Sequence, residues 1–157
     1  MTTIAADNTT VELPTIDNQV LIQQLAAAPS PLPIIKPLLA NIKQQCHEYF
    51  RQTLDATTLV AHRSGLIDQI LFCLWQYSGF NSGTNNIALL AVGGYGRGEL
   101  QPHSDIDLLI VLKDEAAFEQ HKDALQSFIT LLWDIKLDIG HSVRTLDECV
   151  SEAAKDL

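Results

Sequence analysis

Apolar residues in the first half of the chain recur mostly at helical spacing. A stripe that starts at Leu38 continues at intervals of three and four, and a second stripe covers residues 58–77, so each segment predicts a helix. The shorter apolar stretch Val20–Ala28 predicts one more helix. It is followed by PSPLPIIKP, whose four prolines in nine residues argue against a regular helix. Residues 1–18 are polar and aperiodic, and we expect a loose tail there.

After the turn-rich segment SGFNSGTNN the pattern becomes that of strands alternating with helices. Ile87–Val92 is a short, wholly apolar run between turn residues, which is typical of a buried strand. Asp105–Leu112 predicts a second strand. Ile135–Thr145 predicts a third, because apolar and polar side chains alternate along it. Between these last two, Asp114 can cap a helix that runs to about Trp133.

These elements predict an α/β (α+β) fold with a small mixed sheet flanked by helices, preceded by a helical N-terminal region. We divide the chain into three parts. Residues 1–37 hold the tail, the short helix and the Pro-rich segment, and residues 38–85 form the N-terminal helical region. Residues 86–157 form the core that contains the strands, and its last segment, Leu146–Leu157, begins a further helix.

Composition narrows the class of protein. The chain has 157 residues, of which 46% are hydrophobic and 18% charged, so it can bury a core and is not a disordered segment. Its formal charge of -9 argues against a nucleic-acid groove as the main surface. The sequence has no secretory signal and no run of about 18 apolar residues, and its three cysteines suggest no disulfide framework. We therefore expect a cytoplasmic protein.

Two carboxylates at the start of the second predicted strand point to a metal site. Side chains at positions i and i+2 of a strand share one face, so Asp105 and Asp107 are expected on the same side, while Ile106 and Leu108 enter the core. Two adjacent carboxylates repel each other unless a cation joins them, and Mg²⁺ is the natural partner for such oxygens. Alone, the pair fits a solvated strand entrance equally well.

The glycine-rich segment GGYGRGEL shifts that balance towards a phosphate site. Gly93 and Gly94 directly follow a buried strand, and glycine lets backbone amides approach a phosphate closely. If Tyr95–Leu100 begins a short helix, Arg97 lies one turn in and can contact a triphosphate. The spacing matches neither a dinucleotide fingerprint nor a P-loop. The alternative is an ordinary turn between strands.

A two-metal site usually needs a third carboxylate from a neighbouring strand. Asp138 lies on the polar face of the third predicted strand and has the parity to converge with the first two. Asp134 is the competitor, but it falls at the end of a helix, so we favour Asp138. We interpret His141 as a packed histidine, Arg144 as more often a structural partner than a phosphate contact, and Glu99 as a loop-bonding residue.

Together, these residues resemble the DNA-polymerase-β-type nucleotidyltransferase superfamily, whose pattern is an apolar strand, a glycine pair and then Asp-x-Asp. The phrases AVGGYGRGELQPHSDIDLLIVL and LLWDIKLDIGHSVRTLDEC are similar to the N-terminal part of the bifunctional uridylyltransferase/uridylyl-removing enzymes. The resemblance is strong from Ile87 to Cys149 and implies a polymerase-β-like core.

The resemblance implies transfer of UMP from UTP to a tyrosine of the nitrogen-regulatory protein PII, without nucleic acid or membrane as partner. By the same resemblance, magnesium would be held by Asp105, Asp107 and Asp138. The triphosphate would be held by Gly93, Gly94, Arg97 and Ser104.

The chain departs from that family in its length. Such enzymes continue into the rest of the transferase domain, a hydrolase domain with an HD motif, and glutamine-sensing domains. None of the five histidines here is followed by aspartate, so we expect a nucleotidyltransferase core truncated at its C-terminus, with glutamine acting only through absent domains. Two alternatives stay open: an incomplete fragment that only binds metal or nucleotide, and an enzyme with another nucleotide or acceptor.

Overall fold

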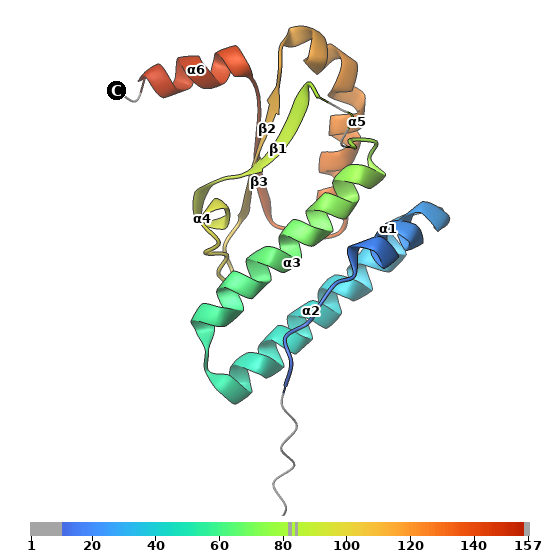
Figure 1. Cartoon of the computed structure of the whole chain (residues 1–157), viewed down its shortest axis with the longest axis vertical. Helices are drawn as coiled ribbons and strands as arrows, with labels where there is room; N and C mark the ends of the chain where they lie inside the picture. Colours follow the sequence, from blue (N-terminus) through green and yellow to red (C-terminus); the bar gives the residue numbers. More distant parts are fainter. Residues whose placement is uncertain (1–10, 82, 84, 156–157) are drawn as a thin grey trace, which may run out of the picture.

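The computed structural model describes residues 11–81, 83 and 85–155. Within this part of the chain, three helices form a bundle beside a three-stranded sheet, and further helices flank the sheet (Figure 1). Residues 11–17 have no regular structure, as expected for the end of a tail. The rest of the predicted tail, residues 1–10, and the last two residues of the predicted C-terminal helix lie outside the described residues.

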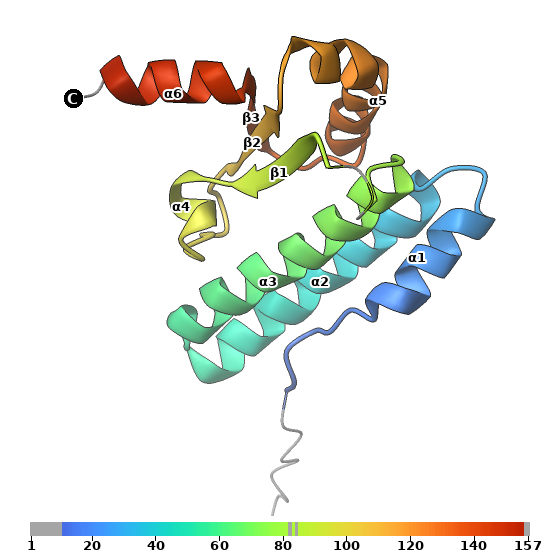
Figure 2. The same ribbon diagram turned by 45° about the horizontal axis from the view of Figure 1, so that its top comes forward.

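The N-terminal region consists of α1 (Asn18–Ala27), α2 (Leu32–Thr53) and α3 (Ala56–Tyr77). Figure 2 shows the three helices side by side below the sheet. Two of them begin at an aspartate cap: Asp17 accepts from the Val20 amide, and Asp55 accepts from the Thr58 amide. The apolar faces of the three helices contribute to one core, and their most buried residues include Leu25, Ile35, Ile70 and Leu74.

The prediction that PSPLPIIKP excludes a regular helix was wrong. Helix α2 starts at Leu32, six residues before the expected Leu38, and it includes Pro33 and Pro37. Pro31 occupies the N-cap position and Pro33 lies in the first turn, where a backbone N–H has no intrahelical partner and its loss costs nothing. Only Pro37 removes a hydrogen bond from the helix interior, and the packing of Ile35 and Ile42 offsets that loss.

The sheet contains β1 (Ile87–Ala91), β2 (Ile106–Leu112) and β3 (Ile139–Thr145) in the order β1-β2-β3. Strands β1 and β2 are antiparallel, whereas β2 and β3 are parallel. The sheet is therefore mixed, and the predicted α/β (α+β) fold with a small mixed sheet flanked by helices is confirmed.

The connection between β2 and β3 is α5 (Glu115–Asp134), which begins at the predicted cap, since Asp114 accepts from the Ala117 amide at 2.9 Å. The third strand, however, begins at Ile139 and not at the predicted Ile135. Residues 135–138 form the turn that ends α5, because Lys136 has a φ of 66° and the Leu137 amide donates to Leu132. A left-handed residue cannot belong to a strand. Helix α6 (Leu146–Lys155) follows β3 directly.

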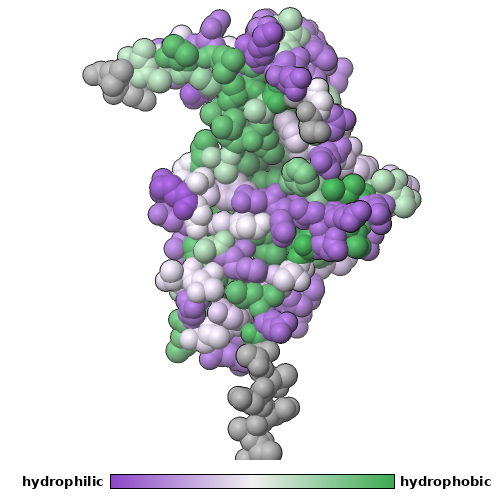
Figure 3. All heavy atoms as spheres, in the orientation of Figure 1, coloured by the Kyte–Doolittle hydropathy of each residue, from purple (hydrophilic) through white to green (hydrophobic). Residues whose placement is uncertain are grey.

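One face of the sheet is covered and the other is partly open. Alternate residues of β2, from Ile106 to Leu112, are buried, whereas Leu109 and Val111 on the opposite face are only partly buried. Figure 3 shows apolar surface over the strands beside α6. Leu90 of β1 and Val150 of α6 are exposed apolar residues, at 42% and 70%. No helix of the described residues is long and apolar enough to cross a membrane.

Candidate active site

The alternation of β2 places Asp107 on the open face of the sheet. Ile106 and Leu108 on either side of it are 3% and 2% exposed and belong to the core. Asp105 directly precedes the strand, has the same parity as Asp107 and is exposed. The side chains that precede and begin β2 therefore present carboxylate oxygens to solvent at the end of the sheet where α4 (Gly93–Gly96) lies (Figure 1).

The carboxylate of Asp107 lies between two glycines that are far apart in sequence. A Cβ atom built on Gly93 would come within 2.7 Å of Oδ2 of Asp107, and a Cβ atom built on Gly140 would come within 2.7 Å of Oδ1. Gly93 also has a φ of 62°, a conformation that favours glycine. The Val92 amide donates to the Asp107 carbonyl at 3.0 Å. This hydrogen bond attaches the glycine turn, residues 93–100, to β2 at Asp107. Both glycines thus leave room for the carboxylate.

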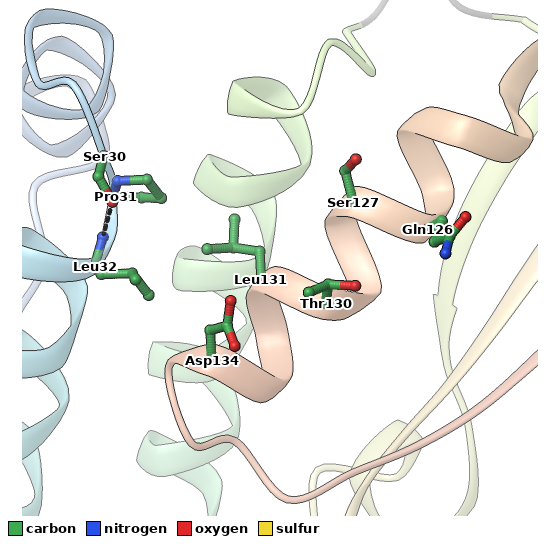
Figure 4. Close-up of a pocket in the computed structure, with 8 residues that line it drawn as sticks. All are labelled: Ser30, Pro31, Leu32, Gln126, Ser127, Thr130, Leu131 and Asp134. Atoms are coloured by element: carbon green, nitrogen blue, oxygen red, sulfur yellow. Dashed lines mark hydrogen bonds between the residues drawn. The ribbon is translucent and has the colours of Figure 1, made fainter.

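The two candidates for a third carboxylate lie in different places. Asp138 directly precedes β3, and its carbonyl accepts from the Ile106 amide at 2.8 Å, so its backbone lies beside Asp105 in the register of β2 and β3. Asp134 ends α5 and lines a pocket with Ser30 and Leu32 at the start of α2 (Figure 4). That pocket is lined by none of Gly93, Asp105, Asp107, Asp138 and Gly140.

The described residues contain no group of three or more His, Cys, Asp or Glu side chains drawn together as a metal site. The donor set nevertheless fits a hard cation. In the part of the chain that is described, the carboxylates of Asp105, Asp107 and Asp138 accept no hydrogen bond and form no ion pair. Carboxylate oxygens are the donors that Mg²⁺ prefers, and Mg²⁺ commonly takes its remaining ligands from water and substrate phosphates.

The other predicted site residues follow the glycine turn. Gly93 and Gly94 open α4, and Arg97 caps its C-terminal end. The Arg97 guanidinium contacts Glu99 at 3.0 Å, in a pair whose side chains are 65% and 59% exposed, so Glu99 does bond within the loop. Ser104 lies in the following turn, where its amide donates to the Gln101 carbonyl at 3.1 Å.

Two of the weaker candidates lie on β3. The ring of His141 lies edge-to-face on Trp133 of α5, with centroids 5.8 Å apart, but both residues are exposed, so the predicted packed histidine is not buried in the core. Arg144 pairs with no carboxylate among the described residues, so its expected structural partner is not found there. Neither residue is brought against the Asp107 carboxylate by the contacts described above.

The sequence reasoning missed a contact behind the glycine turn. Tyr95, in the middle of GGYGRGEL, is 4% exposed, and its hydroxyl donates to Oδ1 of Asp68 on α3 at 2.5 Å. Burial of the ring, followed by the hydrogen bond to Asp68, raises the pKa of the Tyr95 hydroxyl well above its usual value. The one available signal was a large aromatic residue among four glycines, since a tyrosine in such a turn needs a place to pack.

Comparison with known proteins places these observations in a family context. The family described as "Nucleotidyltransferase domain" matches residues 75–154. A bifunctional uridylyltransferase/uridylyl-removing enzyme of Pseudomonas putida (strain W619) is 47% identical over 134 residues, which is 85% of this chain and 15% of that protein. The enzyme of the same name from Azotobacter vinelandii (strain DJ / ATCC BAA-1303) is 44% identical over the same shares of the two chains. No solved structure matches significantly. The chain thus spans about 15% of the length of these curated relatives.

Proposed function

The chain belongs to the nucleotidyltransferase domain family, and from that premise we propose that it forms the metal- and triphosphate-binding part of a uridylyltransferase. The proposed reaction transfers UMP from UTP to a tyrosine of protein PII, in the cytoplasm, where the free thiols of Cys46 and Cys73 are stable. The relatives named uridylyltransferase support this assignment. The observation that carries it is the Asp107 carboxylate held between Gly93 and Gly140, beside the glycine turn.

In this proposal Asp105 and Asp107 hold Mg²⁺, and Asp138 supplies the third carboxylate. The bound metal would neutralise charge on the phosphates. The chain's own contribution is to position these groups. Asp107 lies in β2 and Asp105 directly precedes it, and the Val92–Asp107 hydrogen bond fixes the turn beside them. The tyrosine oxygen forms a bond to the α-phosphorus as the bond to the pyrophosphate leaving group breaks, and the tyrosine proton passes to solvent water.

Gly93, Gly94, Arg97 and Ser104 are the proposed triphosphate ligands. The first amides of a helix have no intrahelical partner, so the start of α4 can donate to phosphate oxygens. Arg97 is available for the same purpose, because its exposed pair with Glu99 contributes only about 0–1 kcal/mol and is easily exchanged for a phosphate.

The test is calorimetric titration of the chain with UTP, in the presence and absence of Mg²⁺. We expect Mg²⁺-dependent UTP binding that Asp107→Asn abolishes, because the substitution removes one carboxylate charge and keeps the shape of the side chain. Asp123→Asn, the same change on the surface of α5, should bind as the wild type does. Equal affinity of Asp107→Asn and wild type would refute the site, and tighter binding of ATP than of UTP would refute the uridylyl assignment.

A second candidate is a catalytically incomplete module that binds metal and nucleotide without turnover. It is favoured by the lack of a preassembled three-ligand group among the described residues. Release of labelled pyrophosphate in the presence of protein PII separates the two candidates. Binding without pyrophosphate release supports the module, and release that depends on Asp107 supports the enzyme.

A further inference from the structure

The glycine turn is attached to the helical region at two points, both on α3. The Tyr95 hydroxyl donates to Asp68 at 2.5 Å, and the Leu100 amide donates to Oγ of Ser64 at 3.3 Å. Ser64 and Asp68 are four residues apart on the helix, so they lie on the same face, one turn from each other. The two contacts hold the turn at positions 95 and 100, on either side of Arg97. Figures 1 and 2 show α4 beside α3.

Three of the four attached residues are buried in the core, whereas the carboxylate acceptor, Asp68, is exposed at its edge. Leu100 is fully buried, Tyr95 is 4% exposed, and Ser64 at 5% is the one buried polar residue of the described chain. Ser64 uses both capacities of its hydroxyl, since it accepts from Leu100 and donates to the Val60 carbonyl at 3.1 Å. Burying a polar group costs free energy unless its hydrogen bonds are formed. The Ser64 hydroxyl therefore fixes the position of the Leu100 amide that donates to it.

The glycine turn needs such support. It contains Gly93, Gly94, Gly96 and Gly98, and glycine has the largest backbone freedom of any residue. A triphosphate ligand made of backbone amides binds well only if those amides are already in place, because ordering them on binding costs affinity. The Tyr95 ring fills space in the core, whereas its hydroxyl adds a directional contact to a charged acceptor.

We propose that Asp68 and Ser64 are positioning residues of the nucleotide site, acting through Tyr95 and Leu100 to hold the glycine turn in its binding shape. This inference rests on the proposed function, because it assumes that the turn binds a triphosphate. The proposal gives α3 a functional role in the nucleotide site, so the N-terminal helical region does more than pack against the sheet. Neither residue touches the nucleotide.

The first experiment measures amide hydrogen exchange of the wild type and of Tyr95→Phe, which removes the hydroxyl and keeps the buried ring. We expect exchange in residues 94–100 to become about tenfold faster, the change that corresponds to loss of one hydrogen bond to a charged group. Exchange in β2 should be unchanged. The control is Tyr77→Phe, which makes the same chemical change at an exposed tyrosine of α3.

The second experiment measures UTP affinity in the presence of Mg²⁺ for the same variants and for Asp68→Ala and Asp68→Asn. Tyr95→Phe and Asp68→Ala should bind UTP about tenfold more weakly, while Asp68→Asn, whose amide oxygen can still accept from Tyr95, should recover most of the affinity. A merely structural role would lower the melting temperature of Tyr95→Phe and leave the affinity of the folded protein unchanged.

The outcomes separate this inference from the proposed function. Wild-type binding of UTP with undiminished binding by Tyr95→Phe overturns the positioning role and leaves the function standing. A wild type that binds no UTP overturns the function, and hydrogen exchange then decides the anchoring alone: faster exchange in residues 94–100 supports it, and unchanged exchange overturns it.

Discussion

At the scale of single residues, Gly140 controls the space around the Asp107 carboxylate. Gly140→Ala would place a methyl group 2.7 Å from Oδ1 of Asp107, so the carboxylate must move. We expect Mg²⁺-dependent UTP affinity to fall at least about tenfold, or about 1.4 kcal/mol, as measured by calorimetry. Gly65→Ala is the control, because nothing lies within 4 Å of a Cβ atom there. Equal affinity of Gly140→Ala and wild type would show that the carboxylate is not a ligand.

The Tyr95 hydroxyl predicts a dependence of stability on alkaline pH. Because the folded state raises the pKa of this group, its contribution to stability is complete below the ordinary tyrosine pKa of about 10. Above that pH the unfolded chain gives up the proton while the folded chain keeps it, so the contribution is lost as pH rises further. Urea unfolding at pH ~8 and pH ~10.5 should show a smaller loss for Tyr95→Phe than for wild type. An equal loss would contradict the buried hydroxyl, and Tyr77→Phe should behave as wild type.

The placement of a site residue could be predicted where it depends only on the neighbouring sequence. Asp105 and Asp107 could be assigned to one side of a strand because alternation is fixed by backbone geometry. The partner of Tyr95 could not be predicted, because Asp68 is 27 residues away and the contact depends on how α3 packs. The approach of Gly140 to Asp107 likewise requires the parallel register of β2 and β3.

At the scale of elements, the N-cap of α5 can be tested directly. Asp114 accepts from the Ala117 amide at 2.9 Å, and Asp114→Ala leaves that amide without its partner. We expect the free energy of unfolding to fall by about 1 kcal/mol. Asp123→Ala, in the middle of the same helix, should change it by less than about 0.5 kcal/mol, as measured by urea denaturation. A similar effect of both substitutions would mean that the cap contributes nothing specific.

Helix α2 carries an internal proline whose replacement should stabilise the protein. Pro37 is exposed and lacks the N–H that would donate to the Pro33 carbonyl. Pro37→Ala should raise the free energy of unfolding on the order of 2 kcal/mol, the helix-interior preference for alanine less the entropy that proline removes from the unfolded chain. Pro33→Ala is the matched control in the first turn and should gain little. A lower melting temperature for Pro37→Ala would contradict this account.

Helices and strands were predictable in kind and less so in extent. The strand Ile87–Ala91 and the helix capped by Asp114 match the sequence pattern to within a residue or two. The start of α2 was missed because proline is harmful only where an N–H is needed, and the register of the first turn decides that. The start of β3 was missed because Lys136 adopts a left-handed conformation, which lysine does not usually favour.

At the scale of the whole molecule, the formal charge of -9 predicts that added salt stabilises the fold. Like charges repel across the compact state, and raising ionic strength from ~0.01 to ~0.1 M shortens the screening length from about 30 to about 10 Å. The melting temperature should therefore rise over this range of NaCl. A decrease would mean that ion pairs outweigh repulsion. Any effect of Mg²⁺ on stability should accordingly be measured at matched ionic strength.

The overall class of the fold could be read from the change of period between the two halves of the chain. The helical half and the alternating half are distinct in sequence and appear as a helical bundle beside a sheet. The strand order β1-β2-β3 and the openness of one face of the sheet arise from packing between distant segments. Apolar periodicity indicates that a strand is buried, but it does not indicate which neighbouring helix or strand buries it.

The confinement of Asp107 between Gly93 and Gly140 links three positions that are 14 and 33 residues apart in the printed sequence. The three residues form one steric constraint, since a Cβ atom at either glycine would come within 2.7 Å of a carboxylate oxygen of Asp107. Without the acid, Gly140 would lose this constraint, whereas the φ of 62° at Gly93 would still favour glycine. A sequence of this family with alanine or serine at position 93 or 140 is thus expected to lack a functional carboxylate site, which the sequence alone would reveal.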